Sequence, residues 1–233
     1  MRKIFFAVLA FCMMGSCMYK KGSGNIITQT RNTGAFKGLE VSGGFVVEIK
    51  NGPTENVVIE ADDNLLKYIE VKVVDNELRV RLQNINVSDA HLKLFITAPE
   101  INNVDASGGS EIIVKDALKS AGKIIVKASS GSNIKTALDA PEIKADVSSG
   151  GELTLSGRTK DFHATSSSGS SLTASELLSE NSYVNVSSGA NAHVYASVSI
   201  DASASSGGNI SYKGAATVIN KAESSGGEVK KDN

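Results

Sequence analysis

The chain of 233 residues is poor in several residue types: it has two cysteines, three prolines and no tryptophan, and aromatic residues make up 5%. Both cysteines, Cys12 and Cys17, lie before residue 18, so nothing after them can form a disulfide or a cysteine metal site. The formal net charge is −1, and no basic patch of the kind that binds nucleic acid is present. We therefore expect a domain that is stabilised by burial and hydrogen bonds, without a nucleic-acid partner.

The N-terminus has the pattern of an export signal. Met1-Arg2-Lys3 precede an apolar run over residues 4–14, which is too short to span a bilayer as a stable helix, and small residues follow at Gly15-Ser16. Cys17 stands directly after them, as in a bacterial lipobox, in which this cysteine is lipidated. We predict a lipoprotein signal peptide over 1–16, lipid attachment at Cys17 and a polar tether over 17–28. An ordinary secretory signal is the alternative.

The lipoprotein interpretation predicts an exported outer-membrane lipoprotein, held to the membrane through the N-terminal lipid. An acidic stretch directly after the cysteine would signal transport to the cell surface, but lysines stand there, at Lys20 and Lys21. Both faces of the outer membrane, the surface and the periplasmic face, therefore stay open.

The second half of the chain repeats a Ser-Gly step at a nearly constant interval. The gaps between successive glycines are 23, 19, 19, 20, 18 and 19 residues, a period that is typical of solenoids. The seven copies are Ser107-Gly108, Ser130-Gly131, Ser149-Gly150, Ser168-Gly169, Ser188-Gly189, Ser206-Gly207 and Ser225-Gly226.

Apolar residues alternate with other residues on both sides of each step, which indicates a strand, a sharp corner and a second strand. A unit of this size cannot bury a core alone, but coils stacked about 4.8 Å apart form continuous aliphatic ladders. We predict a right-handed parallel β-helix with regular coils of about 19 residues over 101–233. The Ser-Ser-Gly sites are expected to be structural corners, because glycine adopts positive φ and serine binds backbone groups. A polar binding stripe along the corners is the alternative.

The first half, residues 29–100, lacks this period but is also rich in strand patterns. Val41-Ser42-Gly43-Gly44-Phe45 is similar to the later corners, and 63–68 is long enough for one helical turn. No linker divides the chain, so we expect one all-β domain over 29–233. The open ends of such a coil also allow a homo-oligomer.

No motif predicts catalysis. His91, His163 and His193 are far apart and lack metal spacing, so we expect no catalytic residue, metal or cofactor. Many β-helices cleave or bind acidic polysaccharides, and such enzymes need paired carboxylates. One cluster of acidic residues therefore supports an enzyme as an alternative. It consists of Asp139, Glu142 and Asp146, with Arg158 and Asp161 nearby.

Three segments near the start resemble a known family: Phe36 to Val41, Val46 to Ile49, and Val58 to Leu66. With the Ser-Gly-Gly repeats and the ending Gly226 to Lys230, they are similar to the "putative auto-transporter adhesin, head GIN domain" family over about residues 30–231. The resemblance implies an exported Bacteroidota protein with a right-handed parallel β-helix. We predict a non-enzymatic, lipid-anchored envelope protein that binds an extended glycan or protein. The alternatives are a structural or stress-linked periplasmic protein and, third, a polysaccharide-active enzyme.

Overall fold

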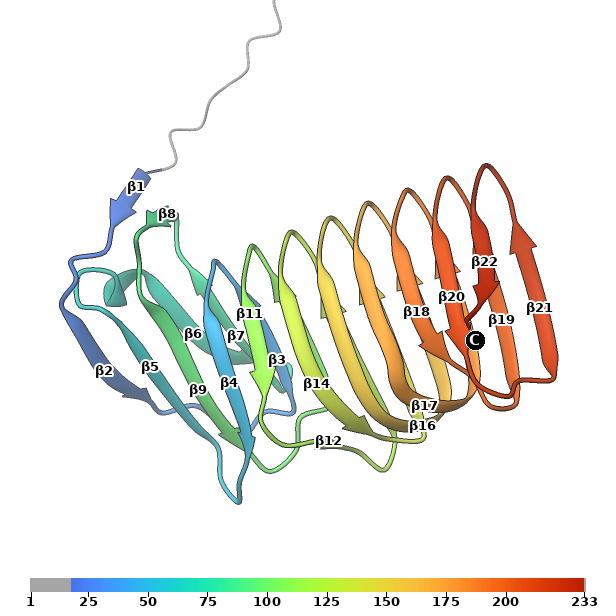
Figure 1. Cartoon of the computed structure of the whole chain (residues 1–233). Coiled ribbons are helices and arrows are strands. Elements are labelled where there is room, and N and C mark those ends of the chain that lie inside the picture. Colours follow the sequence, from blue (N-terminus) through green and yellow to red (C-terminus); the bar gives the residue numbers. More distant parts are fainter. Residues whose placement is uncertain (1–17, 233) are drawn as a thin grey trace, which may run out of the picture.

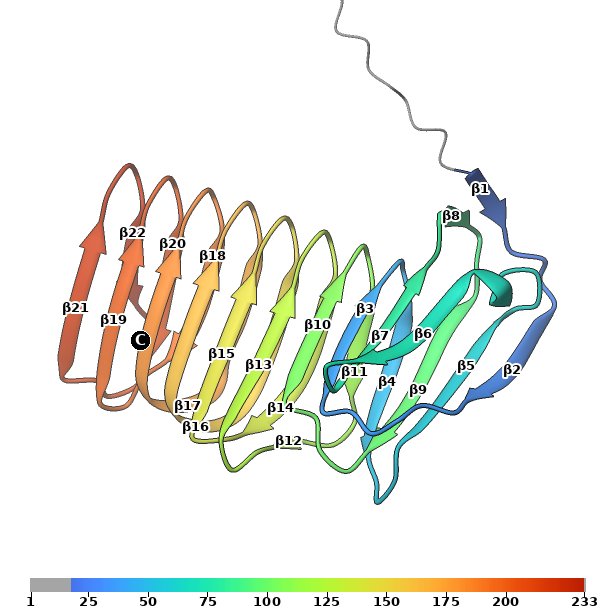
Figure 2. The ribbon, with the colours of Figure 1, turned by 180° about the vertical axis from the view of Figure 1, so that it is seen from behind.

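The computed structural model describes residues 18–232 and shows an elongated β-solenoid (Figure 1). The strands of its regular coils run downward on the near side in Figure 1 and upward on the far side, seen in Figure 2, while the chain advances along the axis. The coil is therefore right-handed, and the predicted parallel β-helix is confirmed. None of the helical structure in 18–232 is long and apolar enough to cross a membrane.

Each coil contributes one strand to a front sheet and one to a back sheet, and successive coils pair in parallel. β16 and β17 are long because each runs through the lower bend from the front sheet into the back sheet. The front strands are β4 (Val46–Asn51), β11 (Glu111–Val114), β14 (Asn133–Asp139), β16 (Glu152–Ser166), β17 (Ser171–Val186), β18 (Asn191–Tyr195), β20 (Asn209–Lys213) and β22 (Glu228–Lys231). The back strands are β3 (Gly38–Ser42), β10 (Asn103–Ser107), β13 (Lys123–Ala128), β15 (Glu142–Val147), β19 (Ser199–Ala204) and β21 (Val218–Glu223), and short β12 (Leu118–Lys119) lies at the lower bend.

The core consists of aliphatic ladders that run along the axis between the two sheets. In the front sheet, Ile134, Leu153, Leu172, Ala192, Ile210 and Val229 stand in register and are all buried. Each fully buried Leu or Ile side chain contributes about 1.5–3 kcal/mol, so the ladder stabilises every contact between coils.

The upper corners are two-residue turns in which serine and glycine both have positive φ. Ser130 and Gly131, for example, have φ of 53° and 72°, as a type I′ turn requires. Gly131 N donates to Ser149 O of the next coil at 3.2 Å, and the later corners repeat this bond. The corners thus form a backbone hydrogen-bonded ladder of their own.

The first corner differs from the prediction by one residue. Ser107 ends β10, and the pair with positive φ is Gly108-Gly109, not Ser107-Gly108. The stacking bond confirms this alignment, because it is Gly109 N that donates to Ser130 O.

Antiparallel strands close the N-terminal end of the coil. In the front sheet, β2 (Ile26–Arg31) pairs with β5 (Asn56–Asp62), and β5 pairs with β9 (Leu92–Ala98). In the back sheet, β6 (Ile69–Val74) pairs with β7 (Glu77–Leu82), after a 3-10 turn η1 at Leu66–Tyr68.

The segment that was expected to be a tether is largely strand. β1 (Met18–Lys21) pairs in parallel with β8 (Ile85–Ser88), and β2 begins at Ile26. The lysines and glycines of this segment suggest a solvent-exposed tether. Backbone pairing between strands needs no apolar side chains, so the sequence pattern does not reveal these strands.

Charged residues cover the C-terminal end. Lys221 and Glu223 of β21 stand in register with the buried Ala202 and Ala204 of the preceding coil. Lys221 Nζ lies 5.1 Å from the Tyr212 ring centroid, and Glu223 Oε1 accepts from Val229 N at 2.7 Å. Charges at inward positions oppose the addition of another strand to this open edge.

Candidate binding surface

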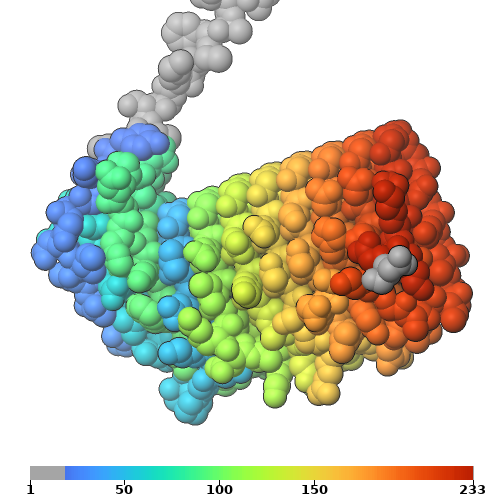
Figure 3. All heavy atoms as spheres, in the orientation of Figure 1, coloured from blue at the N-terminus to red at the C-terminus, as the bar shows by residue number. Residues whose placement is uncertain are grey.

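A groove of about 690 Å³ crosses the outer surface of the front sheet, on the face seen in Figure 3. It runs along the solenoid axis over β11, β14, β16 and β17, so four consecutive coils contribute to it. Its lining residues are Glu111, Ile113, Val114, Asn133, Lys135, Thr136, Ala137, Thr154, Leu155, Ser156, Thr173 and Glu176. The lining combines aliphatic, hydroxyl, amide and charged residues, and none of these residues is aromatic. Thr136 and Leu155 are buried beneath it.

Small side chains and a shift in strand register produce the hollow. Ala137 and Ser156 are direct neighbours in register, so two short side chains lie side by side. The pairing of β16 with β17 then shifts between Thr154 and Ser156, where β17 has one extra residue. A bulge of this kind bends a strand and re-aims its side chains, which gives the otherwise flat sheet a depression.

Charged groups border the groove at three positions. Glu111, Lys135 and Glu176 line it, and within 18–232 none of the three forms an ion pair. Their charges are therefore available to a bound ligand. Lys135 stands between Ile113 and Thr154 in register, in the middle of the groove.

A second hollow, of about 420 Å³, lies at the lower bends and includes Asp139, Arg158, Leu178 and Tyr195. Arg158 binds Asp139 through two contacts, Nε to Oδ1 at 3.0 Å and Nη2 to Oδ2 at 2.8 Å. The hydrogen bonds from Arg158 lower the pKa of Asp139. Both groups stay charged and occupied by each other, which suits a structural clamp better than proton transfer.

The remaining members of the predicted acidic group have separate partners. Glu142 pairs with Lys123 at 2.7 Å, and Asp146 pairs with Lys144 at 3.4 Å. Asp161 Oδ1 accepts from Asn181 Nδ2 at 2.9 Å. The carboxylates that motivated the enzyme alternative are therefore each engaged elsewhere, and none is paired with another.

The three histidines lie in three different environments. His91 Nε2 lies 2.6 Å from Glu60 Oε1, His163 stacks on Tyr183 in the back sheet, and His193 Nδ1 contacts Ser211. In the part of the chain that is described, no group of three or more His, Cys, Asp or Glu residues could hold a metal.

The tyrosines do not gather on one outer face. Tyr212 is only 2% exposed and belongs to the core, whereas Tyr195 lines the lower hollow. The groove residue Ile113 had no signal in the sequence, because it looks like an ordinary strand aliphatic. Cys17 lies outside the described residues.

Comparisons with known proteins give the family from one match and the fold from several others. The model of the family "Putative auto-transporter adhesin, head GIN domain" matches residues 35–216. A search of curated proteins found no match. Among solved structures, one described as a putative adhesin from Bacteroides fragilis has a TM-score of 0.85 at 19% identity, covering 91% of this chain and 100% of its own.

Two Parabacteroides distasonis structures are also similar, and each is covered completely. The first, described as a putative adhesin, has a TM-score of 0.74 at 19% identity over 92% of this chain. The second, described as a "putative lipid binding protein", has a TM-score of 0.68 at 16% identity over 92% of this chain. At these identities the likeness concerns the fold.

Proposed function

Because the chain belongs to the "putative auto-transporter adhesin, head GIN domain" family, we propose that it is a lipid-anchored envelope protein whose front-sheet groove binds an extended segment of a partner protein. The observation that supports this proposal is the groove itself. Three spacings of about 4.8 Å separate β11 from β17, so an extended chain of about four residues matches the groove's length.

The chemistry of the lining favours a polypeptide over a glycan. Ile113 and Ala137 offer aliphatic contact on the outer face, and the hydroxyls of Thr154 and Thr173 can bind a peptide backbone. Ligand sites of this kind combine apolar walls with a few polar groups that set orientation. The groove has no aromatic ring on which a sugar could stack, and this makes a glycan the weaker candidate.

A blocked groove tests the proposal. We would screen a displayed library of random linear peptides against the wild type and against Ala137→Lys, which places a long side chain in the groove. Asn185→Lys adds the same charge to an exposed site in the back sheet and is the matched control. We expect enriched peptides with alternating apolar residues, retained by Asn185→Lys and lost by Ala137→Lys.

Equal binding by both variants, or no enrichment, would rule out the groove as a peptide site. Parallel assays with a glycan array and a fluorescent fatty acid distinguish the other ligands. Binding of the fatty acid alone, blocked by Ala137→Lys, would replace the peptide with an acyl chain, which is the ligand suggested by the description of the second Parabacteroides distasonis structure.

The anchor is tested separately, in cells. Protease treatment of intact cells is compared between the wild type and Cys17→Ala. Digestion of the wild type that changes on replacement of Cys17 would support an anchored protein on the cell surface. Protection until the outer membrane is permeabilised would instead support the periplasmic face.

A further inference from the structure

The first strand of the described structure begins immediately after the predicted lipid site. β1 starts at Met18, one residue beyond Cys17, and pairs with β8 from its first residue. Further bonds fasten the end of β1: Asn64 Nδ2 donates to Lys21 O at 2.9 Å, and Gly22 N donates to Ser88 O at 3.2 Å. Little free chain therefore separates Cys17 from the solenoid.

This short connection limits how far the solenoid can lie from a membrane that holds Cys17. An extended chain spans at most about 3.6 Å per residue, so the Cα atoms of Cys17 and Tyr19 are within about 7 Å. The headgroup region on each side of a bilayer is about 5–7 Å thick. An acylated Cys17 would thus hold Tyr19 at headgroup level.

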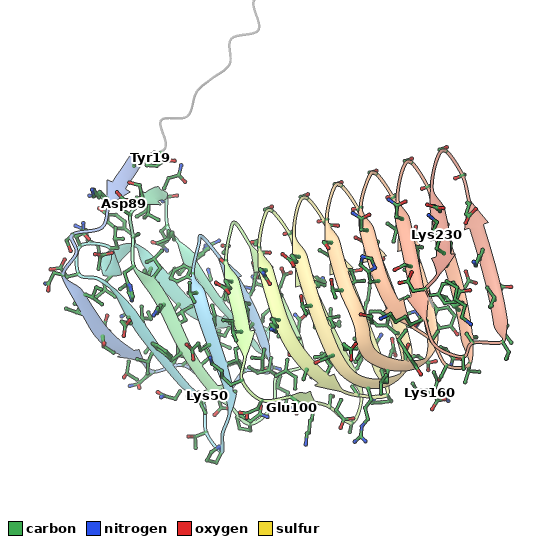
Figure 4. All side chains as sticks on the ribbon, in the orientation of Figure 1. Tyr19, Lys50, Asp89, Glu100, Lys160 and Lys230 are labelled. Atoms are coloured by element: carbon green, nitrogen blue, oxygen red, sulfur yellow. The ribbon has the colours of Figure 1, made fainter. Side chains whose placement is uncertain are left out.

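The residues at the end of the solenoid that carries β1, here called the β1 pole, suit that position. Tyr19 is 70% exposed, and Figure 4 shows it at the tip of β1, beside Asp89. Tyrosine is enriched at membrane interfaces because its ring is apolar and its hydroxyl is polar. An aromatic side chain this exposed has no evident purpose in the fold, because it contributes little to the core.

Two lysines near Tyr19 carry a charge that suits anionic lipid. Lys20 Nζ lies 5.2 Å from the centroid of the Tyr68 ring, and Lys67 Nζ lies 5.3 Å from it. Over residues 18–232 neither lysine pairs with a carboxylate, whereas Lys21 is neutralised by Asp89 at 3.2 Å. Both ammonium groups therefore keep their charge beside the Tyr68 ring, and each such group near an anionic surface favours docking about fivefold.

We propose that Tyr19, Lys20 and Lys67 form a membrane-contact surface for anionic phospholipid, so that the solenoid sits directly on the bilayer rather than at the end of a tether. This inference rests on the proposed acylation of Cys17. It goes further by assigning a second membrane contact, made by the folded domain itself. This contact determines which end of the solenoid faces the membrane.

The absence of tryptophan makes the contact measurable, since Tyr19→Trp introduces the sole indole of the protein. The acylated variant is placed in vesicles of phosphatidylcholine with phosphatidylglycerol, with and without brominated acyl chains. We expect a blue-shifted tryptophan emission, and we expect the brominated lipid to quench most of its intensity. Tyr183→Trp, on the back sheet, is the control, and we expect water-like emission without quenching.

Charge reversal tests the role of the lysines in the Tyr19→Trp background. Lys20→Glu with Lys67→Glu should reduce quenching in anionic vesicles, with little change in vesicles of phosphatidylcholine alone. Lys50→Glu with Lys160→Glu is the matched control, because both lysines are exposed and lie on the opposite side from Tyr19 in Figure 4. Circular dichroism verifies that each variant is folded.

Three results are decisive. Quenching of Tyr19→Trp alone, weakened only by the Lys20 and Lys67 reversals, supports the proposal. Acylated protein whose Tyr19→Trp emission stays water-like overturns the membrane contact while leaving the anchor intact. Mass spectrometry that finds no acyl group on Cys17 overturns the anchor, and the contact surface fails with it.

Discussion

At the residue scale, two buried serines in equivalent corner positions differ in their hydrogen bonds. Ser132 Oγ donates to Ala106 O at 2.7 Å and accepts from Ser129 N at 2.9 Å. Ser110 Oγ is buried without a partner among residues 18–232. We expect Ser132→Ala to lower the free energy of unfolding by about 1–3 kcal/mol and Ser110→Ala to leave it equal or higher. Urea unfolding measures both, and equal losses would contradict the assignment.

Asp105 gives a pH-dependent prediction at the same scale. Burial raises the pKa of this carboxyl, and Glu40, Glu77 and Asp146 add to the rise against the opposing effect of Lys127. A native pKa above the unfolded one means that the charged form costs stability at neutral pH, and that the cost disappears as pH falls through the native pKa. Asp105→Asn should therefore raise the urea midpoint at pH 7 and lose this advantage near pH 3. An advantage that is constant with pH would show that ionisation is not the cause.

At the element scale, two glycines with positive φ have different surroundings. At Gly157, φ is 108° and a Cβ would collide with the backbone oxygen of Leu138 in the adjacent coil. At Gly131, φ is 72° and a Cβ would meet open space. We expect Gly131→Ala to cost about 1–2 kcal/mol, from conformation alone. Gly157→Ala should cost about 3 kcal/mol or more, because backbone strain and overpacking add. Equal losses in urea unfolding would argue against the collision.

Elements whose signal is local could be predicted from the sequence, and those that depend on partners could not. The Ser-Gly pairs specify their turns because few residues other than glycine and small polar residues tolerate two successive positive φ angles. The corner at Gly108-Gly109 was misplaced by one residue, since only the stacking on Ser130 fixes its alignment. β1 depends on its partner β8, and its own sequence does not reveal it.

The groove was also beyond sequence reasoning. It arises where Ala137 faces Ser156 across coils and where the register of β16 against β17 shifts. Both features concern residues about 19 positions apart in neighbouring coils, and a single sequence shows the period but not the register. The antiparallel strands β5, β6, β7 and β9 lie in the half that was predicted to be rich in strands, without their direction or partners, whereas β2 begins in the segment predicted as a tether.

On the scale of the whole molecule, the solenoid has unequal ends. The N-terminal half buries large side chains such as Phe36, Leu39 and Phe45. In the last coil β21 is exposed along its whole length, and the buried apolar residues that remain are Ala216, before β21, and Val229 of β22. Stability in stacked coils is close to a sum of each coil and its neighbours, so the C-terminal end should open first.

Hydrogen exchange tests this gradient. Amides of β21 and β22 should exchange fastest, and those of β3, β4 and β10 slowest, because exchange through local opening follows the burial that each opening must break. Val229→Ala removes the last rung of the front ladder, so it should speed exchange in β20 and β22 and leave β4 unchanged. If exchange is uniform along the axis, or if Val229→Ala speeds exchange in β4 equally, the solenoid opens as one cooperative unit. In that case the ladders between the sheets couple the coils more strongly than the unequal ends weaken them.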